Sequence, residues 1–214
     1  VYTFSLLKGM MGISFLAKAC TWLFYSLLLY IFFAGGAGNF ILKHAFLALG
    51  KMVEHFPTMA TYTDPMGENH FPENWTIFYW AYWMVWCVAA PFFIGSISKG
   101  RTIRQTILGG YGFGVGSTFV SFLVLGNYSL SLEVFHKLPV VQIYESSQSL
   151  YETIVKCLEV LPLAPLVLLL LLLTMFAFYA TSFDSIALVA SQYSYKSLAE
   201  GEEPGKKVQG FWAI

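Results

Sequence analysis

Apolar residues in this chain gather into long blocks that polar residues separate. Four blocks are long enough to cross the hydrocarbon core of a bilayer, which takes about 20 mainly apolar residues. They cover residues 19–37, 75–97, 107–125 and 161–190, and the last contains the leucine-rich run 166–173. The pattern therefore predicts an all-α integral membrane protein with four transmembrane helices.

Two shorter stretches mix apolar and polar residues. Residues 39–56 repeat apolar positions among lysines and histidines, which is typical of an amphipathic helix lying along the membrane surface. Residues 150–158 indicate a second short interfacial helix. Residues 61–74 contain two prolines and a glycine and predict a loop.

Composition agrees with a membrane protein and excludes other classes. Hydrophobic residues make up 57% of the chain and charged residues 11%, whereas soluble domains carry about 25% charged residues. The formal net charge is zero, so no basic surface for nucleic acid is expected. The spans offer no cluster of titratable groups or metal ligands, so we expect no enzyme and no organic cofactor.

Lysines and arginines predict the orientation in the membrane. Eight of the twelve precede the first span, separate the second from the third, or follow the fourth. We expect these segments to be cytoplasmic, with Arg101 and Arg104 anchored at lipid phosphates and contributing to a cytoplasmic gate. The predicted protein is multi-pass and lies in the plasma (inner) membrane. Residues 205–214 read as the start of a further span, so we expect a piece of a longer protein.

An aromatic stripe runs along the second predicted span. Its members are Trp75, Tyr79, Tyr82, Trp83 and Trp86, which fall within an arc of about 100° at 100° per residue. An interfacial aromatic belt explains Trp75 but not Trp86, which lies about 16 Å further along a helix. Plain helix packing remains an alternative.

The stripe also suits an aromatic cage for a quaternary ammonium group. Indole and phenol faces attract such cations, and the span contains no aspartate or glutamate. Pro91 follows five residues after Trp86 and can bend the helix. Helices interrupted near the midplane form the substrate sites of many secondary transporters.

Three segments carry a family resemblance. Residues 74–83 (Asn-Trp-Thr-Ile-Phe-Tyr-Trp-Ala-Tyr-Trp) resemble the signature of the betaine/carnitine/choline transporter family, with Tyr82 where the family usually has Trp. Residues 98–104 resemble the Ser-basic-Gly-Arg-Thr-aliphatic-Arg loop that follows this helix in the family. Residues 62–67 are similar to a loop in its carnitine-exchanger branch.

The resemblance implies a fragment of a twelve-helix transporter with a five-plus-five inverted repeat and a sodium-symporter-like fold. Residues 1–37 would end the first repeat, residues 38–74 would form an extracellular amphipathic helix and loop, and residues 75–214 would begin the second repeat. The four spans would be helices seven to ten. Tyr82, Trp83 and Trp86 match substrate-box positions, and Tyr79 shares their stripe. The family also implies a homotrimer.

A polar group lies near the end of the fourth span. Thr181 and Ser182 match a hydroxyl pair that binds Na⁺ in the sodium-coupled members, although such hydroxyls often bond back to the preceding helical turn. The exchanger branch has a methionine where this chain has Ala90. Asp184 has either a structural or gating role or a role in ion ligation, and charged residues inside spans are functional candidates.

The combined reading is a secondary active transporter that imports a trimethylammonium compound of the betaine, choline or carnitine type, with Na⁺ as the coupling ion. One alternative is an ion-independent exchanger of substrate and product of the carnitine type. Another is a membrane receptor that binds the same ligands without transport, because it would use the same cage.

Overall fold

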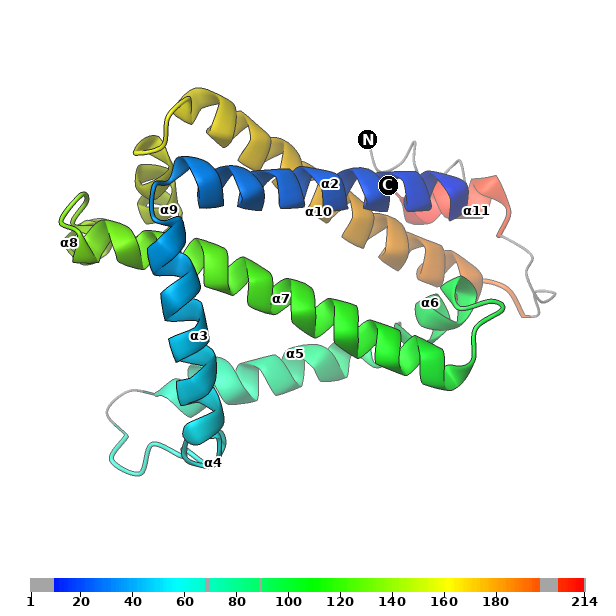
Figure 1. The fold of residues 1–214 in the computed structure, drawn as a ribbon. Helices are drawn as coiled ribbons and strands as arrows, with labels where there is room; N and C mark the ends of the chain where they lie inside the picture. Colours follow the sequence, from blue (N-terminus) through cyan, green and yellow to red (C-terminus); the bar gives the residue numbers. More distant parts are fainter. Residues whose placement is uncertain (1–9, 68–69, 89, 197–203, 214) are drawn as a thin grey trace.

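The computed structural model describes residues 10–67, 70–88, 90–196 and 204–213, and every regular element within these ranges is a helix (Figure 1). The helices are, in chain order, α2 (Met10–Ala34), α3 (Gly38–Glu54), α4 (Phe56–Ala60), the π-helix η1 (Pro72–Ile77), α5 (Phe78–Trp86), α6 (Ala90–Ile97), α7 (Ile103–Val134), α8 (Val140–Ser147), α9 (Leu150–Glu159), α10 (Ala164–Tyr193) and α11 (Lys206–Trp212). Among them α2, α7 and α10 are long and apolar enough to cross a membrane. The all-α class and the multi-pass membrane assignment are confirmed.

The most extensive helix pair is formed by α2 and α10 (Figure 1). Phe24 of α2 meets Phe178 of α10 edge to face, with ring centroids 5.6 Å apart. Toward the chain termini, Ile13 of α2 packs in one buried cluster with Leu188 of α10. These contacts make α2 and α10 a packed frame on which the other helices are arranged.

The first span is already helical at Met10, the first residue that the structure describes, and it ends at Ala34 rather than at residue 37. It ends there because the chain turns at two glycines, and Gly36 has a φ of +66°, a conformation that favours glycine. A Cβ atom at Gly35 would lie 2.7 Å from Cε2 of Tyr128. Gly35 therefore lets α7 approach the end of α2.

The third span is longer than predicted and runs from Ile103 to Val134 instead of residues 107–125. Thr102 starts it with a capping box, since its hydroxyl accepts from the Gln105 N–H and the Gln105 side chain accepts from the Thr102 N–H. At the other end, His136 adopts a φ of +53° and the Lys137 N–H donates to the Leu132 carbonyl over 2.9 Å. That geometry is a Schellman-type stop, here built without glycine.

The amphipathic helix α3 docks on α7 through a polar contact. Nδ1 of His44 lies 2.9 Å from Oδ1 of Asn127, which is 7% exposed. The Asn127 amide group donates to the Leu123 carbonyl, so its oxygen is the acceptor and His44 donates. Phe40 stacks on the His44 ring with a centroid distance of 5.2 Å. The contact fixes where α3 crosses the bundle.

Two short helices, α8 and α9, follow α7. The predicted helix at 150–158 matches α9, in which Ser149 caps the N-terminus and Cys157 faces the buried core. Burial raises the pKa of the Cys157 thiol. Lys156 and Glu159 form an exposed ion pair of 3.0 Å. Helix α8 was not predicted, because its eight residues are too few to show a clear period.

The second predicted span, residues 75–97, is interrupted near the proline that the sequence analysis singled out. Residues 75–97 are divided among η1, α5 and α6, with a break at Cys87 and Val88. Pro91 has no N–H to donate to the Cys87 carbonyl, and its ring disfavours an unbroken helix. The Cys87 N–H instead donates to the Met84 carbonyl over 3.3 Å, which tightens the last turn of α5.

The fourth span and the basic segments complete the arrangement. Helix α10 runs from Ala164 to Tyr193 instead of residues 161–190. The α6–α7 turn, the end of α10 and α11 lie at one end of the molecule, while α8 and α9 lie at the other (Figure 1). The turn that contains Arg101 and the start of α11 at Lys206 therefore share the end that the sequence assigns to the cytoplasm, whereas Lys18 lies within α2 and Lys8 lies outside the described residues.

We expect Asn127→Ala to destabilise the full-length protein by about 0.5–2 kcal/mol, because it removes the His44 partner at a helix–helix contact. The measurement is the unfolding free energy from an SDS titration. Ser129→Ala is the matched control, since the Ser129 hydroxyl is exposed and donates to Gly126 of its own helix. Equal losses in the two variants would contradict a role for the His44–Asn127 contact.

Candidate functional site

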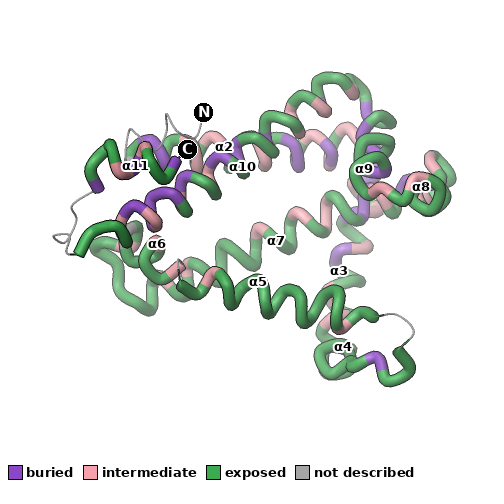
Figure 2. The backbone as a smooth tube through the Cα atoms, turned by 180° about the vertical axis from the view of Figure 1, so that it is seen from behind, coloured by how far each residue is buried: buried purple, intermediate pink, exposed green. Residues whose placement is uncertain are grey.

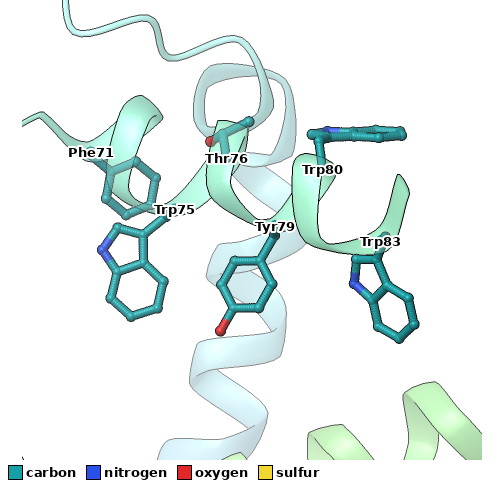
Figure 3. Close-up of a pocket in the computed structure, with 6 residues that line it drawn as sticks. All are labelled: Phe71, Trp75, Thr76, Tyr79, Trp80 and Trp83. Atoms are coloured by element: carbon teal, nitrogen blue, oxygen red, sulfur yellow. The ribbon is translucent and has the colours of Figure 1, made fainter. Parts of the chain in front are cut away.

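Aromatic side chains line a surface pocket of about 450 Å³ beside η1 and α5. The lining residues are Phe71, Trp75, Thr76, Tyr79, Trp80 and Trp83. Phe71, Trp75, Tyr79 and Trp83 project to the same side of the helix, whereas Thr76 and Trp80 project to the other side (Figure 3). The pocket is therefore mainly a wall of rings.

Successive turns of this helix stack their rings. The Phe71 and Trp75 planes differ by 24° with centroids 6.4 Å apart, and those of Trp75 and Tyr79 differ by 20° at 6.1 Å. The π-helical geometry of η1 widens the turn around Trp75 relative to an α-helix. The stripe is thus present, although its first turn does not follow the 100° step used to predict it.

The rings of the three residues that match the family's substrate-box positions, Tyr82, Trp83 and Trp86, lie next to one another. Tyr82 meets Trp83 edge to face at 5.9 Å, and Tyr82 and Trp86 are tilted by 57° at 6.2 Å. Trp83 and Tyr79 line the pocket, whereas Tyr82 and Trp86 lie beside it without lining it. The four predicted residues therefore lie on one short helix, and two of them, Tyr79 and Trp83, line the pocket.

The sequence reasoning missed Phe71, Thr76 and Trp80 as lining residues. Phe71 stands four residues before Trp75, so extending the stripe by one turn would have found it. It was not included because the predicted span began at Trp75. Trp80 lies outside the predicted arc and reaches the pocket from the opposite side of the helix (Figure 3).

The pocket has no charged side chain among its lining residues. A cation held there would meet ring faces, which attract cations through their quadrupoles, and not a carboxylate. No residue of α5 is buried within the described chain, and Tyr82 is 46% exposed. The ring faces are therefore accessible to a ligand or to further helices.

Thr181 and Ser182 lie on α10 and bond back to its preceding turn. The Thr181 hydroxyl donates to the Ala177 carbonyl over 2.8 Å, and the Ser182 hydroxyl donates to the Phe178 carbonyl over 3.1 Å. This is the local bonding that membrane helices commonly show. A hydroxyl that donates its proton keeps oxygen lone pairs, so both side chains retain the capacity to coordinate a hard cation.

Asp184 lies three residues after Thr181 and is fully buried, with 0% of its surface exposed. It therefore lies inside the protein and away from the water boundary. Buried carboxylates are retained where they are paired or hydrogen-bonded, because an isolated buried charge is costly. That burial fits a structural or gating role better than a place on an exposed loop.

Arg101 and Arg104 lie at the turn that joins α6 to α7. Gly100 has a φ of +82°, and the Arg101 N–H donates to the Ser98 carbonyl over 2.9 Å. Both arginines are exposed, and in the described part of the chain neither forms an ion pair. They are free to meet lipid phosphates or another part of the protein.

Comparison with known proteins supplies the family. The model of the betaine/carnitine/choline family transporter matches residues 1–214. A carnitine transporter of Acinetobacter baumannii is 32% identical over 180 residues, which is 84% of this chain and 32% of that protein. The chain thus spans about a third of the length of this curated relative. Because the family model covers every residue, the chain belongs to the betaine/carnitine/choline transporter family.

Proposed function

We propose that the full-length protein is a secondary active transporter that imports a trimethylammonium compound. The family points to transport of this substrate class and away from an enzyme. The observation that carries the proposal is the uncharged pocket of about 450 Å³ with aromatic walls. A trimethylammonium head presents a charge spread over methyl groups, which ring faces accommodate without a hydrogen-bond partner.

The interrupted helix supports the same function. Secondary transporters form substrate sites near the midplane from helices that are broken there, so that one half can move relative to the other. Tyr82, Trp83 and Trp86 occupy the last turns of α5, just before the break at Cys87 and Val88. In this proposal the four rings bind the ammonium group together, Tyr79 and Trp83 from the pocket lining and Tyr82 and Trp86 from the adjoining positions of the same helix.

The chain supplies one part of the proposed molecule. We infer a twelve-helix protein with two inverted five-helix repeats, in which the four predicted spans are helices seven to ten. The absence of buried residues in α5 supports this inference, since an apolar helix with no buried residue needs neighbours from the rest of the protein. The proposed assembly is a homotrimer in the plasma (inner) membrane.

Na⁺ is the proposed coupling ion. Thr181 and Ser182 supply two oxygen ligands on neighbouring residues of α10, and their back-bonding leaves lone pairs available. Ala90, the first residue of α6, stands where the exchanger branch has a methionine. This position therefore has no methionine sulfur that could take the place of a coupling ion. The remaining ligands would come from parts of the protein that this chain does not contain.

Carnitine is one of the proposed substrates because the Acinetobacter baumannii relative is named as a carnitine transporter. Ion-independent exchange of substrate and product is the second candidate function, and binding without transport is the third. Uptake of radiolabelled betaine, choline and carnitine into liposomes, with and without a Na⁺ gradient, separates the three. Accumulation driven by Na⁺ supports the proposal, and binding without uptake or exchange overturns it.

We expect Trp86→Ala to weaken binding of the transported compound by about 2- to 30-fold, the effect of losing one cation–π contact of about 0.5–2 kcal/mol. Equilibrium binding of the radiolabelled compound to the purified full-length protein measures it. Trp22→Ala on α2 is the matched control, since Trp22 is 77% exposed and far along the chain from the pocket. An unchanged affinity in Trp86→Ala would remove Trp86 from the site.

We expect Thr181→Ala to raise the Na⁺ concentration that gives half-maximal uptake, because it removes a ligand oxygen. Thr174→Ala is the control, since the Thr174 hydroxyl also donates to a carbonyl one turn earlier on α10, over 2.7 Å. Sodium titration of uptake distinguishes the variants. If both titrations match that of the unmodified protein, Thr181 is not an ion ligand.

A further inference from the structure

A single tyrosine joins α10 to the break in the second span. The Tyr193 hydroxyl donates to the Val88 carbonyl over 2.9 Å. The Tyr193 ring also packs on Phe92, with centroids 4.7 Å apart and planes tilted by 60°. Val88 lies in the break and Phe92 lies in α6, so the tyrosine contacts both the interruption and the helix that follows it.

The break creates the need for such a partner. A helix that stops leaves backbone carbonyls of its last turn without partners in that helix, and in a membrane few water molecules are present to replace them. Pro91 has no N–H, so the helix cannot simply continue across the break. Tyr193 provides a donor from a neighbouring helix at this position.

Tyr193 links the helix that carries the proposed ion site to the helix that carries the aromatic rings. It is the last residue of α10, twelve residues after Thr181, which is about 18 Å along the helix at 1.5 Å per residue. On the other side of the contact, Trp86 is two residues before Val88. In Figure 1, α6 lies beside the C-terminal end of α10, at the end of the molecule that carries Arg101.

The contact between Tyr193 and Phe92 is suited to being made and broken. Tyr193 is 50% exposed and Phe92 is 53% exposed, so their separation uncovers little additional apolar surface. The frame contacts differ, because Leu188 and Ile31, both in α2–α10 packing regions, are at most 1% exposed. The α6–α10 contact is thus much weaker in packing than the frame itself.

We propose that Tyr193 is a positioning residue that latches α6 to α10 and so holds closed the end of the pathway that carries Arg101. The latch opens when the transporter exposes its substrate to that end. The second readout below rests on the proposed transport function, and the first does not. In this proposal α10 communicates the occupancy of Thr181 to the aromatic helix through one hydroxyl and one ring.

Cys87 provides a reporter inside the break. Its side chain is exposed, whereas Cys20 and Cys157 are buried. Tyr193→Phe removes the hydroxyl and keeps the ring contact with Phe92. The labelling rate of Cys87 by a small hydrophilic maleimide is measured in the full-length protein in lipid nanodiscs, where both faces are accessible, and the labelled peptide is identified by mass spectrometry.

We expect Tyr193→Phe to label Cys87 about fivefold faster, the shift in an opening equilibrium for the loss of one hydrogen bond of about 1 kcal/mol net. Tyr30→Phe is the matched control, because the Tyr30 hydroxyl also donates to a backbone carbonyl, that of Pro162, on the approach to the other end of α10. A general loss of stability would accelerate labelling equally in both variants and would overturn the latch.

The second readout is uptake kinetics. With the latch weakened in Tyr193→Phe, a smaller fraction of the molecules exposes the substrate site to the external side, so the KM for external substrate rises by up to about fivefold. Tyr30→Phe is expected to keep the original KM. An unchanged KM and an unchanged Cys87 labelling rate in Tyr193→Phe would overturn the proposal. Absence of uptake in the unmodified protein would count against the proposed function alone, because labelling tests the latch separately.

Discussion

A helix that crosses a bilayer has to pair its backbone N–H and C=O groups within the protein, because the hydrocarbon core offers no water. The described chain meets this requirement by long helices in α2, α7 and α10, and departs from it between α5 and α6. The departure follows from Pro91, which cannot donate to the carbonyl four residues earlier. The break separates an aromatic helix from a short apolar one, and the arrangement of the site depends on it.

The described helices differ in how far they are buried within this chain. Buried contacts join α2, α7 and α10, and single polar contacts such as Tyr128 to the Cys157 carbonyl (3.1 Å) tie α9 to that frame. The helix that carries the rings has no buried residue in the described chain. Figure 2 shows this division as buried backbone along α2 and α10 and exposed backbone along α5. The exposed faces of α5 are therefore the ones on which further helices of the full-length protein would pack.

Hydrophobic pattern alone located three spans and two interfacial helices, because blocks such as residues 166–173 have few alternatives to a membrane helix. Their ends were less predictable. The stop of α2 at Ala34 involves a close approach of Gly35 to Tyr128, and the stop of α7 before His136 depends on a left-handed residue that is not glycine. The second span is interrupted between α5 and α6, and the sequence signal for this is Pro91, which has no N–H and can bend a helix.

The candidate site was predictable to a similar degree. Period and residue type identified Tyr79, Tyr82, Trp83 and Trp86, and the structure places them on one helix. The pocket also includes Trp80 and Phe71, since a π-helical start shifts the register and the hollow extends around the helix. Tyr193 carried no sequence signal, because its contact with Val88 joins residues 105 positions apart.

The docking of α3 has a consequence for how the helices depend on one another. His44 donates from Nδ1 to the Asn127 side-chain oxygen, while the Asn127 amide group donates to the Leu123 carbonyl of the preceding turn of α7. One amide group therefore links the surface helix to the backbone of a membrane-spanning helix. A shift of α7 at Leu123 would be carried to α3 through this single side chain.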